Sequence, residues 1–478
     1  MSTRDARFDG RLFVGVRTTG IYCRPVCPAR TPKREHVEFF PTAAAAHEAG
    51  FRPCLRCRPE TAPDFAAWRG TSNTVARALT LIDLGGLDET DVDTLASRLG
   101  VGERQLRRLF KQHLGASPIA VAQTRRVLLA KQLIHETTLP MSEVALASGF
   151  GSIRRFNETF QRLFDRPPTA LRRSGVASTA AADGAVTLKL RYRPPYDWAS
   201  MLGFLALRAI PGVEVVRGNT YMRTLAFDGQ HAVVSVRPGA SNTLQVTVRT
   251  RRVTALPTII ARVRRVFDLS ADPRAIGAHL SEDPALATLV AARPGLRVPG
   301  SWDGFELAVR AVLGQQVTVK AAVRLAGFLV STCGEPLAAP GAPIDGLTHV
   351  FPSAARLAAL DPSALPMPRA RALALTALAA SVDADPAIFS TGRSLDDVVA
   401  RLRSLKGIGE WTAQYIAMRE LREPDAFPSA DVGLMRALAG PDGTRPNAQQ
   451  LQARAEWWRP WRAYAALHLW MADAPASS

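Results

Sequence analysis

Four of the five cysteines in this chain form two closely spaced pairs near its amino-terminal end. The pairs are Cys23 with Cys27 and Cys54 with Cys57, whereas Cys333 lies far away in an apolar stretch. A CxxxC and a CxxC on two neighbouring turns have the ligand set and spacing of a tetrahedral zinc site. Two disulfides are the alternative. The charged start, MSTRDARFDGR, lacks the apolar segment of a signal peptide, so we expect a reducing compartment, where such pairs bind one Zn²⁺ rather than cross-link.

The basic composition favours a polyanionic partner. The formal net charge is +18 over 478 residues. Such a charge promotes phosphate contacts and electrostatic steering, although a solvated arginine-rich surface has the same composition. A chain of this length is expected to contain several domains. No apolar run approaches the length of a membrane span, so we expect a cytoplasmic, nucleoid-associated monomer that binds double-stranded DNA and no membrane.

An internal repeat follows the cysteine-rich segment. The stretch LASRLGV at residues 95–101 returns as VALASGF at residues 144–150. Each copy predicts a short helix, a turn made possible by Gly100 or Gly149, and a second, basic helix, which is the pattern of a helix-turn-helix unit. Helix pairs with basic faces also occur as plain packing units. The second helices carry the side chains that we expect to reach bases and phosphates: Arg104, Gln105, Arg107 and Arg108 in the first copy, and Arg154, Arg155, Asn157 and Glu158 in the second.

A small α+β region is predicted next. Residues 175–185 are small and unpatterned, which is typical of a flexible linker. Apolar and polar residues then alternate over 186–192, and further alternating segments such as HAVVSVRP and TLQVTVRT follow. With the helical patterns at 197–210 and 257–269, these segments predict an antiparallel sheet with two helices.

The rest of the chain is predicted to be almost entirely helical. From about Ser281 it is rich in alanine, leucine and arginine, and LKGIGEWTA at 405–413 joins two helical segments by a glycine hairpin. Gly407 and Gly409 let backbone N–H groups approach a DNA phosphate. An ordinary tight helix connection is the alternative. Asp431 follows about twenty residues later, at a position that also suits a helix cap.

The cysteine-rich segment resembles a known family. FVGVRTTGIYCRPVCPAR and GFRPCLRC are similar to the methylphosphotriester-repair zinc domain of the Ada family. The resemblance implies that Cys23 is both a zinc ligand and the nucleophile that accepts a methyl group from a DNA phosphate. Zinc keeps sulfur deprotonated, and methylation would lower the negative charge of the site and strengthen DNA binding. A purely structural zinc is the alternative.

The repeat resembles a family of transcription activators. GFGSIRRFNETFQRLFDRPPTALRR is similar to the helix-turn-helix of AraC-type activators, and residues 119–136 are similar to the helix that links their two units. The resemblance implies promoter DNA as a partner.

The helical part resembles the helix-hairpin-helix DNA glycosylases. Five segments, RPPYDWASMLGFLALRA, ARPGLRVPG, RAVLGQQVTV, KGIGEWTAQYIAMR and WWRPWRAYAALHLW, are similar in order to 3-methyladenine DNA glycosylase II of the AlkA type. The resemblance implies alkylated DNA as the substrate and no cofactor for this part. It also implies roles for individual residues. These are Asp431 as the catalytic carboxylate, Trp411, Tyr415, Trp470 and Phe204 as the base pocket, Gln316 as the wedge that fills the gap left by the flipped nucleotide, and Lys406, Gly407 and Gly409 as DNA contacts.

Two departures refine this expectation. Trp411 occupies the position at which lyase members of the superfamily carry a nucleophilic lysine, so no strand cleavage is expected. Some family members have an apolar wedge, so Gln316 leaves the damage selectivity open.

The PCHR-type active site of the usual Ada carboxyl-terminal module does not occur here, and Cys333 does not supply it.

The expected fold is multidomain and mainly α. It comprises a small four-cysteine zinc domain (1–70), an AraC-type double helix-turn-helix (71–174), a linker (175–185), an α+β subdomain (186–295) and an all-α helix-hairpin-helix glycosylase domain (296–473). The expected function is DNA alkylation repair by a monofunctional glycosylase joined to a suicide methyl acceptor and a regulatory DNA-binding module. The alternative is a transcriptional activator of an alkylation response whose glycosylase part only binds damaged DNA.

Overall fold

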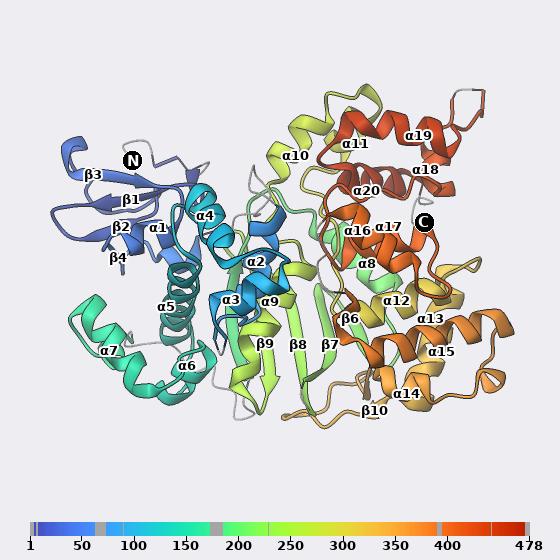
Figure 1. Cartoon of the computed structure of the whole chain (residues 1–478), viewed down its shortest axis with the longest axis horizontal. Helices are drawn as coiled ribbons and strands as arrows, with labels where there is room; N and C mark the ends of the chain where they lie inside the picture. The colour runs from blue at the N-terminus through green and yellow to red at the C-terminus, as the bar shows by residue number, and fades with distance from the viewer. Residues whose placement is uncertain are drawn as a thin grey trace. The chain divides into compact units, whose positions relative to one another are not determined.

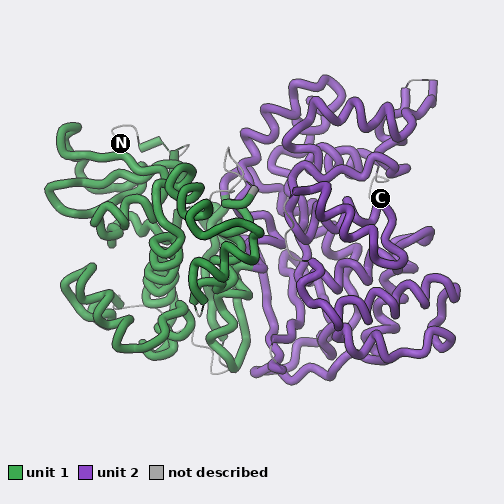
Figure 2. The backbone as a smooth tube through the Cα atoms, in the orientation of Figure 1, with its two compact units in different colours: residues 1–192, 239–261 green, residues 193–238, 262–478 purple. Residues whose placement is uncertain are grey.

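The computed structural model describes residues 4–5, 8–62, 73–88, 90–172, 185–227, 229–389, 394–440 and 442–473. These residues form two compact units (Figure 2). Unit 1 comprises residues 1–192 and 239–261, and unit 2 comprises residues 193–238 and 262–478. The predicted linker at 175–185 lies outside the described residues except for its last residue. Among the described helices, none combines the length and the apolar character that a membrane span requires.

Unit 1 begins with a small four-stranded sheet (Figure 1). Its strand order is β3-β1-β2-β4, with β1 antiparallel to both β2 and β3, and β4 parallel to β2. Phe13, Tyr22, Ala46 and Phe51 form the core between the sheet and helix α1. The elements are β1 (Phe13–Val16), β2 (Ile21–Cys23), η2 (Arg34–His36), β3 (Val37–Phe40), α1 (Ala43–Glu48), β4 (Arg52–Pro53) and η3 (Pro59–Thr61).

In the described part of unit 1 between residues 73 and 164, six helices follow, and they contain the predicted repeat. Gly100 and Gly149 have positive φ angles of 69° and 80° in the two turns, a conformation that favours glycine. A Cβ atom on Gly149 would lie 2.6 Å from an Asp88 carboxylate oxygen, so this position requires glycine. The helices are α2 (Asn73–Asp83), α3 (Val92–Arg98), α4 (Glu103–Leu114), α5 (Pro118–Glu136), α6 (Met141–Ala147) and α7 (Ile153–Phe164), followed by η4 (Pro168–Leu171).

Apolar spacing explains how α4 and α7 pack. Leu106, Phe110 and Leu114 are the buried residues of α4, and Phe156, Phe160 and Phe164 are those of α7. Both sets recur every four residues, which places them on one face of a helix. The opposite face of each helix therefore stays available to solvent or to a ligand.

The strands of the predicted α+β region form antiparallel pairs in both units. In unit 1, β5 (Ala185–Arg191) pairs with β9 (Thr243–Thr250), with Leu188 opposite Val246. In unit 2, β7 pairs with β6 and with β8. The predicted helix at 197–210 is shorter, since α8 ends at Leu207. The helix predicted at 257–269 is α9, which ends at Val266. The remaining bounds are α8 (Trp198–Leu207), β6 (Glu214–Arg217), β7 (Thr220–Phe227), β8 (Gln230–Gly239), η5 (Val253–Ala255) and α9 (Leu256–Val266).

Helix α12 lies at the centre of the helical part of unit 2. All its residues except Arg310 are buried, which is typical of a helix surrounded by others. The mainly helical multidomain fold is thus confirmed. The elements are α10 (Pro273–Leu280), α11 (Pro284–Ala292), α12 (Gly304–Leu313), α13 (Val319–Cys333), β10 (Glu335–Pro336), β11 (His349–Val350), α14 (Ala354–Ala358), η6 (Pro362–Ala364), α15 (Arg369–Ala384), η7 (Pro386–Phe389), α16 (Leu395–Arg403), α17 (Glu410–Arg419), α18 (Val432–Ala437), α19 (Ala448–Ala455), η8 (Glu456–Trp458) and α20 (Arg462–Asp473).

Candidate functional site

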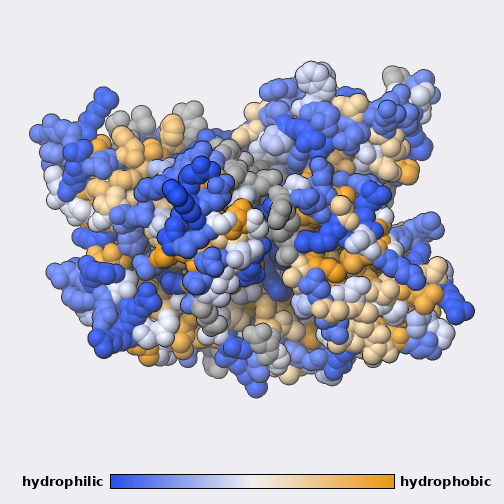
Figure 3. All heavy atoms as spheres, in the orientation of Figure 1, coloured by the Kyte–Doolittle hydropathy of each residue, from blue (hydrophilic) through white to orange (hydrophobic). Residues whose placement is uncertain are grey.

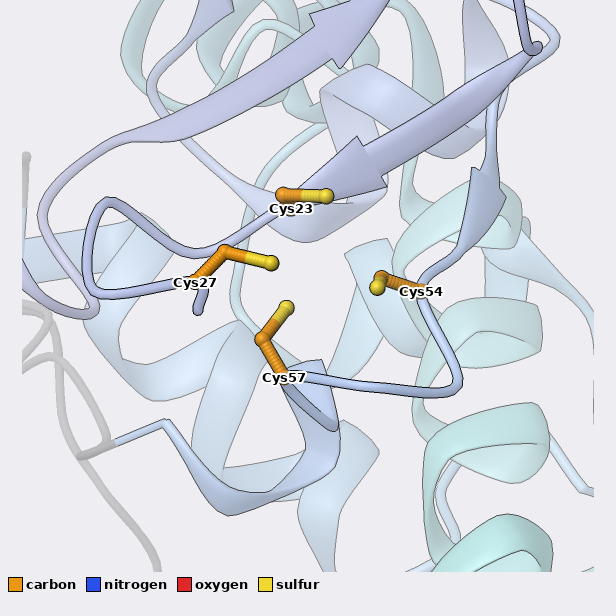
Figure 4. Close-up of side chains that lie close together, drawn as sticks. All are labelled: Cys23, Cys27, Cys54 and Cys57. Atoms are coloured by element: carbon orange, nitrogen blue, oxygen red, sulfur yellow. The ribbon is translucent and has the colours of Figure 1, made fainter. Parts of the chain in front are cut away.

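The four predicted cysteines converge in unit 1 (Figure 4). Cys23 ends β2, and the parallel pairing of β2 with β4 brings it beside Cys54. Cys27 and Cys57 lie on the turns that follow. All four are buried and free, and their Sγ atoms lie within 4.8 Å of one another. Sulfurs around one tetrahedral Zn²⁺ are about 3.8 Å apart, given Zn–S bonds of about 2.3 Å. The cluster fits one zinc ion, as predicted.

The sulfurs differ in their hydrogen bonds. The Sγ atom of Cys57 accepts a bond of 3.3 Å from the backbone N–H of Arg24, and that of Cys54 accepts one of 3.3 Å from the backbone N–H of Arg56. Over the described residues, no N–H group donates to Cys23 or Cys27. Hydrogen bonds to a ligand atom draw charge from it, so Cys23 and Cys27 keep more negative charge on sulfur than the other two.

A buried ion pair joins the cysteine-bearing loop to helix α5. The Lys131 Nζ atom lies 2.8 Å from the Glu60 carboxylate and donates a 3.2 Å hydrogen bond to the carbonyl of Cys54. Both charged side chains are almost completely buried. Burial alone would raise the pKa of Glu60, but Lys131 and Arg58 lower it below its ordinary value. Sequence reasoning missed this pair.

The predicted arginines of α4 and α7 are exposed. Arg108 donates to Gln105 at 2.9 Å, and Arg154 pairs with Glu158 at 2.7 Å. Within the described ranges, no hydrogen bond or ion pair involves the side chains of Arg104 and Arg155. The surface over α4 is strongly hydrophilic (Figure 3). These helices thus present available cations, as DNA-reading helices do.

The predicted pocket residues come together in unit 2. Phe204, Trp411, Tyr415, Asp431 and Trp470 line one cavity of about 660 Å³. The rings of Trp411 and Tyr415, one helical turn apart on α17, stack with centroids 5.1 Å apart, and Trp470 meets Tyr415 edge-on at 6.4 Å. Such a cavity has the size and the aromatic walls of a site for a flat ligand.

Asp431 lies at the amino-terminal end of α18. One carboxylate oxygen accepts hydrogen bonds from the backbone N–H of Leu434 at 3.0 Å and from the indole of Trp470 at 2.9 Å. The other oxygen accepts a bond of 2.7 Å from the indole of Trp411. Asp431 is therefore a helix cap, as the alternative held, and it also lines the cavity. Two indole donors fix the orientation of its charge.

Sequence reasoning missed Arg208 and Arg419, which are two of the four arginines that line the cavity and which lie against its aromatic rings. Arg419 donates to the Tyr415 hydroxyl at 2.6 Å, and its guanidinium lies 4.8 Å from the centre of the Phe204 ring. The Arg208 guanidinium lies 3.8 Å from the same centre. Burial would raise the pKa of Tyr415, but Arg419 and Arg208 lower it. The available signal was spacing, because each arginine follows an aromatic residue by four positions on a helix.

The hairpin and the predicted wedge lie on exposed loops. Lys406, Gly407 and Gly409 are exposed in the connection from α16 to α17. Gly407 has a φ of +86°, and a Cβ atom there would lie 2.6 Å from the Cβ of Ala374, so glycine is required. Gln316 is exposed between α12 and α13 with a φ of +56°, which is uncommon for a residue other than glycine.

Comparison with known families identifies three parts of the chain. Residues 1–60 match the metal binding domain of Ada, residues 95–174 match a helix-turn-helix domain, and residues 187–303 match the AlkA N-terminal domain. The 3-methyladenine DNA glycosylase of Archaeoglobus fulgidus superposes with a TM-score of 0.53, at 21% identity, over 60% of this chain and 97% of that one. It shares the fold of the glycosylase part.

Two relatives are similar over most of their length. The chain is 37% identical to the DNA-3-methyladenine glycosylase 2 of Escherichia coli, over 59% of this chain and 96% of that protein. It is 44% identical, over 98% of this chain and 94% of the relative, to the "Probable bifunctional transcriptional activator/DNA repair enzyme AlkA" of Mycobacterium tuberculosis. The chain therefore belongs to the family of bifunctional transcriptional activators and DNA repair enzymes of the AlkA type.

Proposed function

We propose that this protein hydrolyses the N-glycosidic bond of alkylated bases of the 3-methyladenine type in DNA. The observation that carries the proposal is the Asp431 carboxylate, held by two indole N–H groups at the wall of an aromatic cavity. An alkylated purine is cationic, so it stacks well on electron-rich rings once it leaves the duplex. Trp411, Tyr415 and Trp470 are the surfaces for this stacking.

The reaction then needs little more than an oriented negative charge. When the C1′–N bond breaks, its electron pair stays on the base, which becomes neutral, while positive charge develops on the sugar. Asp431 stabilises that charge, and water adds to C1′ and loses a proton. Trp411 occupies the place of a lyase lysine, so no covalent sugar adduct forms and the strand stays intact.

We further propose that Cys23 accepts a methyl group from methylphosphotriesters. Bound Zn²⁺ supplies a thiolate at neutral pH. The Cys23 sulfur attacks the methyl carbon, the carbon–oxygen bond breaks, and the phosphate is left as an ordinary diester anion. Its lack of an N–H donor among the described residues favours Cys23 over Cys54 and Cys57. Cys27 shares this lack, and Cys23 is preferred because it matches the Ada nucleophile.

The regulatory part would bind promoter DNA through α4 and α7. The working form would be a monomer, in the cytoplasm and on the nucleoid.

The family matches at 1–60, 95–174 and 187–303 support a division into the zinc domain, the helix-turn-helix domain and the α+β subdomain. We propose the boundaries predicted above for all five segments.

Base release is the decisive experiment. Purified protein is incubated with methylated duplex DNA, and the free bases are separated by chromatography. Release of 3-methyladenine, with abasic sites and no strand breaks before alkali treatment, is the expected result. Tight binding to the methylated DNA without any released base would favour an activator whose glycosylase part only binds damage.

A further inference from the structure

Three segments of unit 2 meet around the loop that carries Gln316. The side-chain amide of Gln315 donates a 2.8 Å hydrogen bond to the carbonyl of Gly407 in the hairpin. The guanidinium of Arg371, in the first turn of α15, donates to the backbone carbonyl of Gln315. Gly407 in turn packs closely on Ala374 of α15. The wedge loop, the hairpin and α15 therefore form a closed triangle of contacts.

The carbonyl that Arg371 holds belongs to the peptide immediately before Gln316. The orientation of that peptide plane is coupled to the φ angle of Gln316, which is +56°. A left-handed residue other than glycine is strained and persists only where its surroundings impose it, as occurs at ligand clamps. Among the described contacts, the charged donor of Arg371 is the group that fixes this peptide plane.

We propose that Arg371 is a positioning residue for the wedge. By holding the Gln315 carbonyl, it keeps Gln316 in the left-handed conformation before DNA arrives. The hydrogen bond from Gln315 to Gly407 then fixes the position of the wedge relative to the hairpin. When the hairpin binds a phosphate, Gln316 is already placed for insertion into the duplex. The inference rests on the proposed glycosylase function and adds a determinant of how that activity reaches a base inside a duplex.

The wedge matters only where a flipped nucleotide leaves a gap in stacked, paired DNA. Loss of Arg371 should therefore impair excision from duplex DNA and spare excision from single-stranded DNA. A hydrogen bond from a charged donor shifts an equilibrium by roughly tenfold, so Arg371→Ala is expected to lower the single-turnover rate on methylated duplex DNA by about that factor. The rate on methylated single strands should stay at the wild-type value.

A fluorescence measurement reports the wedge directly. The duplex contains an abasic-site analogue with 2-aminopurine beside it, and the protein is saturating, so differences in affinity do not enter. We expect wild type and Arg371→Lys, which keeps a cationic donor, to raise the fluorescence by unstacking 2-aminopurine, and Arg371→Ala to give a clearly smaller rise. Arg369→Ala is the matched control, because it removes the same charge from an exposed position two residues away and should leave the signal unchanged.

The outcomes separate this inference from the proposed function. If Arg371→Ala keeps the wild-type ratio of duplex to single-strand rates and the full fluorescence rise, the positioning role is wrong while the glycosylase stands. An equal loss on both substrates would show a merely structural arginine and would also overturn it. If wild-type protein releases no base from either substrate, the proposed function fails and this inference fails with it.

Discussion

At the residue scale, the chemistry assigned to the aromatic cavity depends on one charge. Asp431 lies between the indoles of Trp411 and Trp470, and its charge is needed only as the sugar becomes positive. Asp431→Asn removes that charge and keeps the shape of the side chain. Its single oxygen can still accept from the Trp470 indole and the Leu434 N–H, whereas the bond from the Trp411 indole is lost. We expect base release to fall by roughly 10²–10³-fold, the usual effect of losing one such electrostatic group, with little change in affinity for abasic-analogue DNA. Base release at the wild-type rate would show that the assigned mechanism is wrong.

A buried histidine predicts that unit 2 loses stability in acid. Burial, and to a lesser degree Arg293, lowers the pKa of His468 to about 4, and its Nδ1 atom has no hydrogen-bond partner in the described structure. The unfolded chain therefore takes up a proton near pH 6.5 that the folded chain takes up only near pH 4. The free energy of unfolding is therefore unaffected by this histidine above pH 6.5 and decreases as the pH falls from 6.5 toward 4.

His468→Leu removes this proton uptake. Between pH 7 and pH 4, the free energy of unfolding of the wild type should fall relative to the variant by about 3 kcal/mol, because each unit of pKa difference corresponds to about 1.4 kcal/mol. Denaturant unfolding of both proteins at several pH values measures the change. Parallel pH profiles would contradict the assignment.

At the scale of elements, α5 is joined to the zinc loop by the buried pair of Lys131 and Glu60. Glu60→Gln leaves the Lys131 ammonium with neutral acceptors, and breaking a buried ion pair costs about 3–5 kcal/mol. We expect faster hydrogen exchange in peptides covering residues 54–62 and 118–136 of the full chain. The double variant Glu60→Gln with Lys131→Met should recover much of the loss, because no buried charge then remains unpaired.

The same pair predicts a pH dependence and has a matched control. The pKa of Glu60 is lowered in the folded chain, so its contribution is present above the ordinary carboxyl pKa and is lost as pH falls through the lowered value. The difference in hydrogen-exchange rate between wild type and Glu60→Gln should therefore become smaller as the pH falls. Glu158→Gln in the exposed pair with Arg154 should change exchange little. If Glu60→Gln and Glu158→Gln change hydrogen exchange to a similar extent, the buried pair does not hold the zinc loop to α5.

At the scale of the whole molecule, the two proposed reactions belong to residues in separate units of one chain. Cys23 lies in unit 1 and Asp431 in unit 2, and neither reaction uses the other residue. Cys23→Ala should abolish methyl transfer from methylphosphotriester DNA and leave base release unchanged, whereas Asp431→Asn should do the reverse. Peptide mass spectrometry and base chromatography on the same samples test both. A methyl group on Cys27, Cys54 or Cys57 in the wild type would show that Cys23 is not the acceptor.

Methylation should also act on DNA binding by the whole chain. Four thiolates on Zn²⁺ carry a net charge of about −2, and methylation of one sulfur leaves about −1. Less negative charge beside the phosphate backbone strengthens association. Protein treated with methylphosphotriester DNA should therefore bind undamaged duplex DNA more tightly than untreated protein, and the Cys23→Ala variant should show no such response.

Local patterns in the sequence determined much of this protein. The cysteine spacing predicted the zinc cluster because each pair lies on one turn. Gly100 and Gly149 marked the turns of the helix-turn-helix units. Both have a positive φ angle, which a side chain disfavours by steric clash within the residue itself, so glycine is the local signal of such a turn. The end of α8 at Leu207, before the predicted limit of 210, shows that helix boundaries are less well determined, since tertiary contacts compete with local preference in the last turn.

Only the tertiary structure decided how distant polar groups meet. The bonds from Trp411 and Trp470 to Asp431 span 20 and 39 residues, and the Lys131–Glu60 pair spans 71. The same holds for Arg371 and the peptide before Gln316, 56 residues apart. Periodicity and spacing report which face of one element is apolar, but they carry no distance between elements. Packing of the helices sets those distances, and a polar group is buried only where packing also supplies its partner.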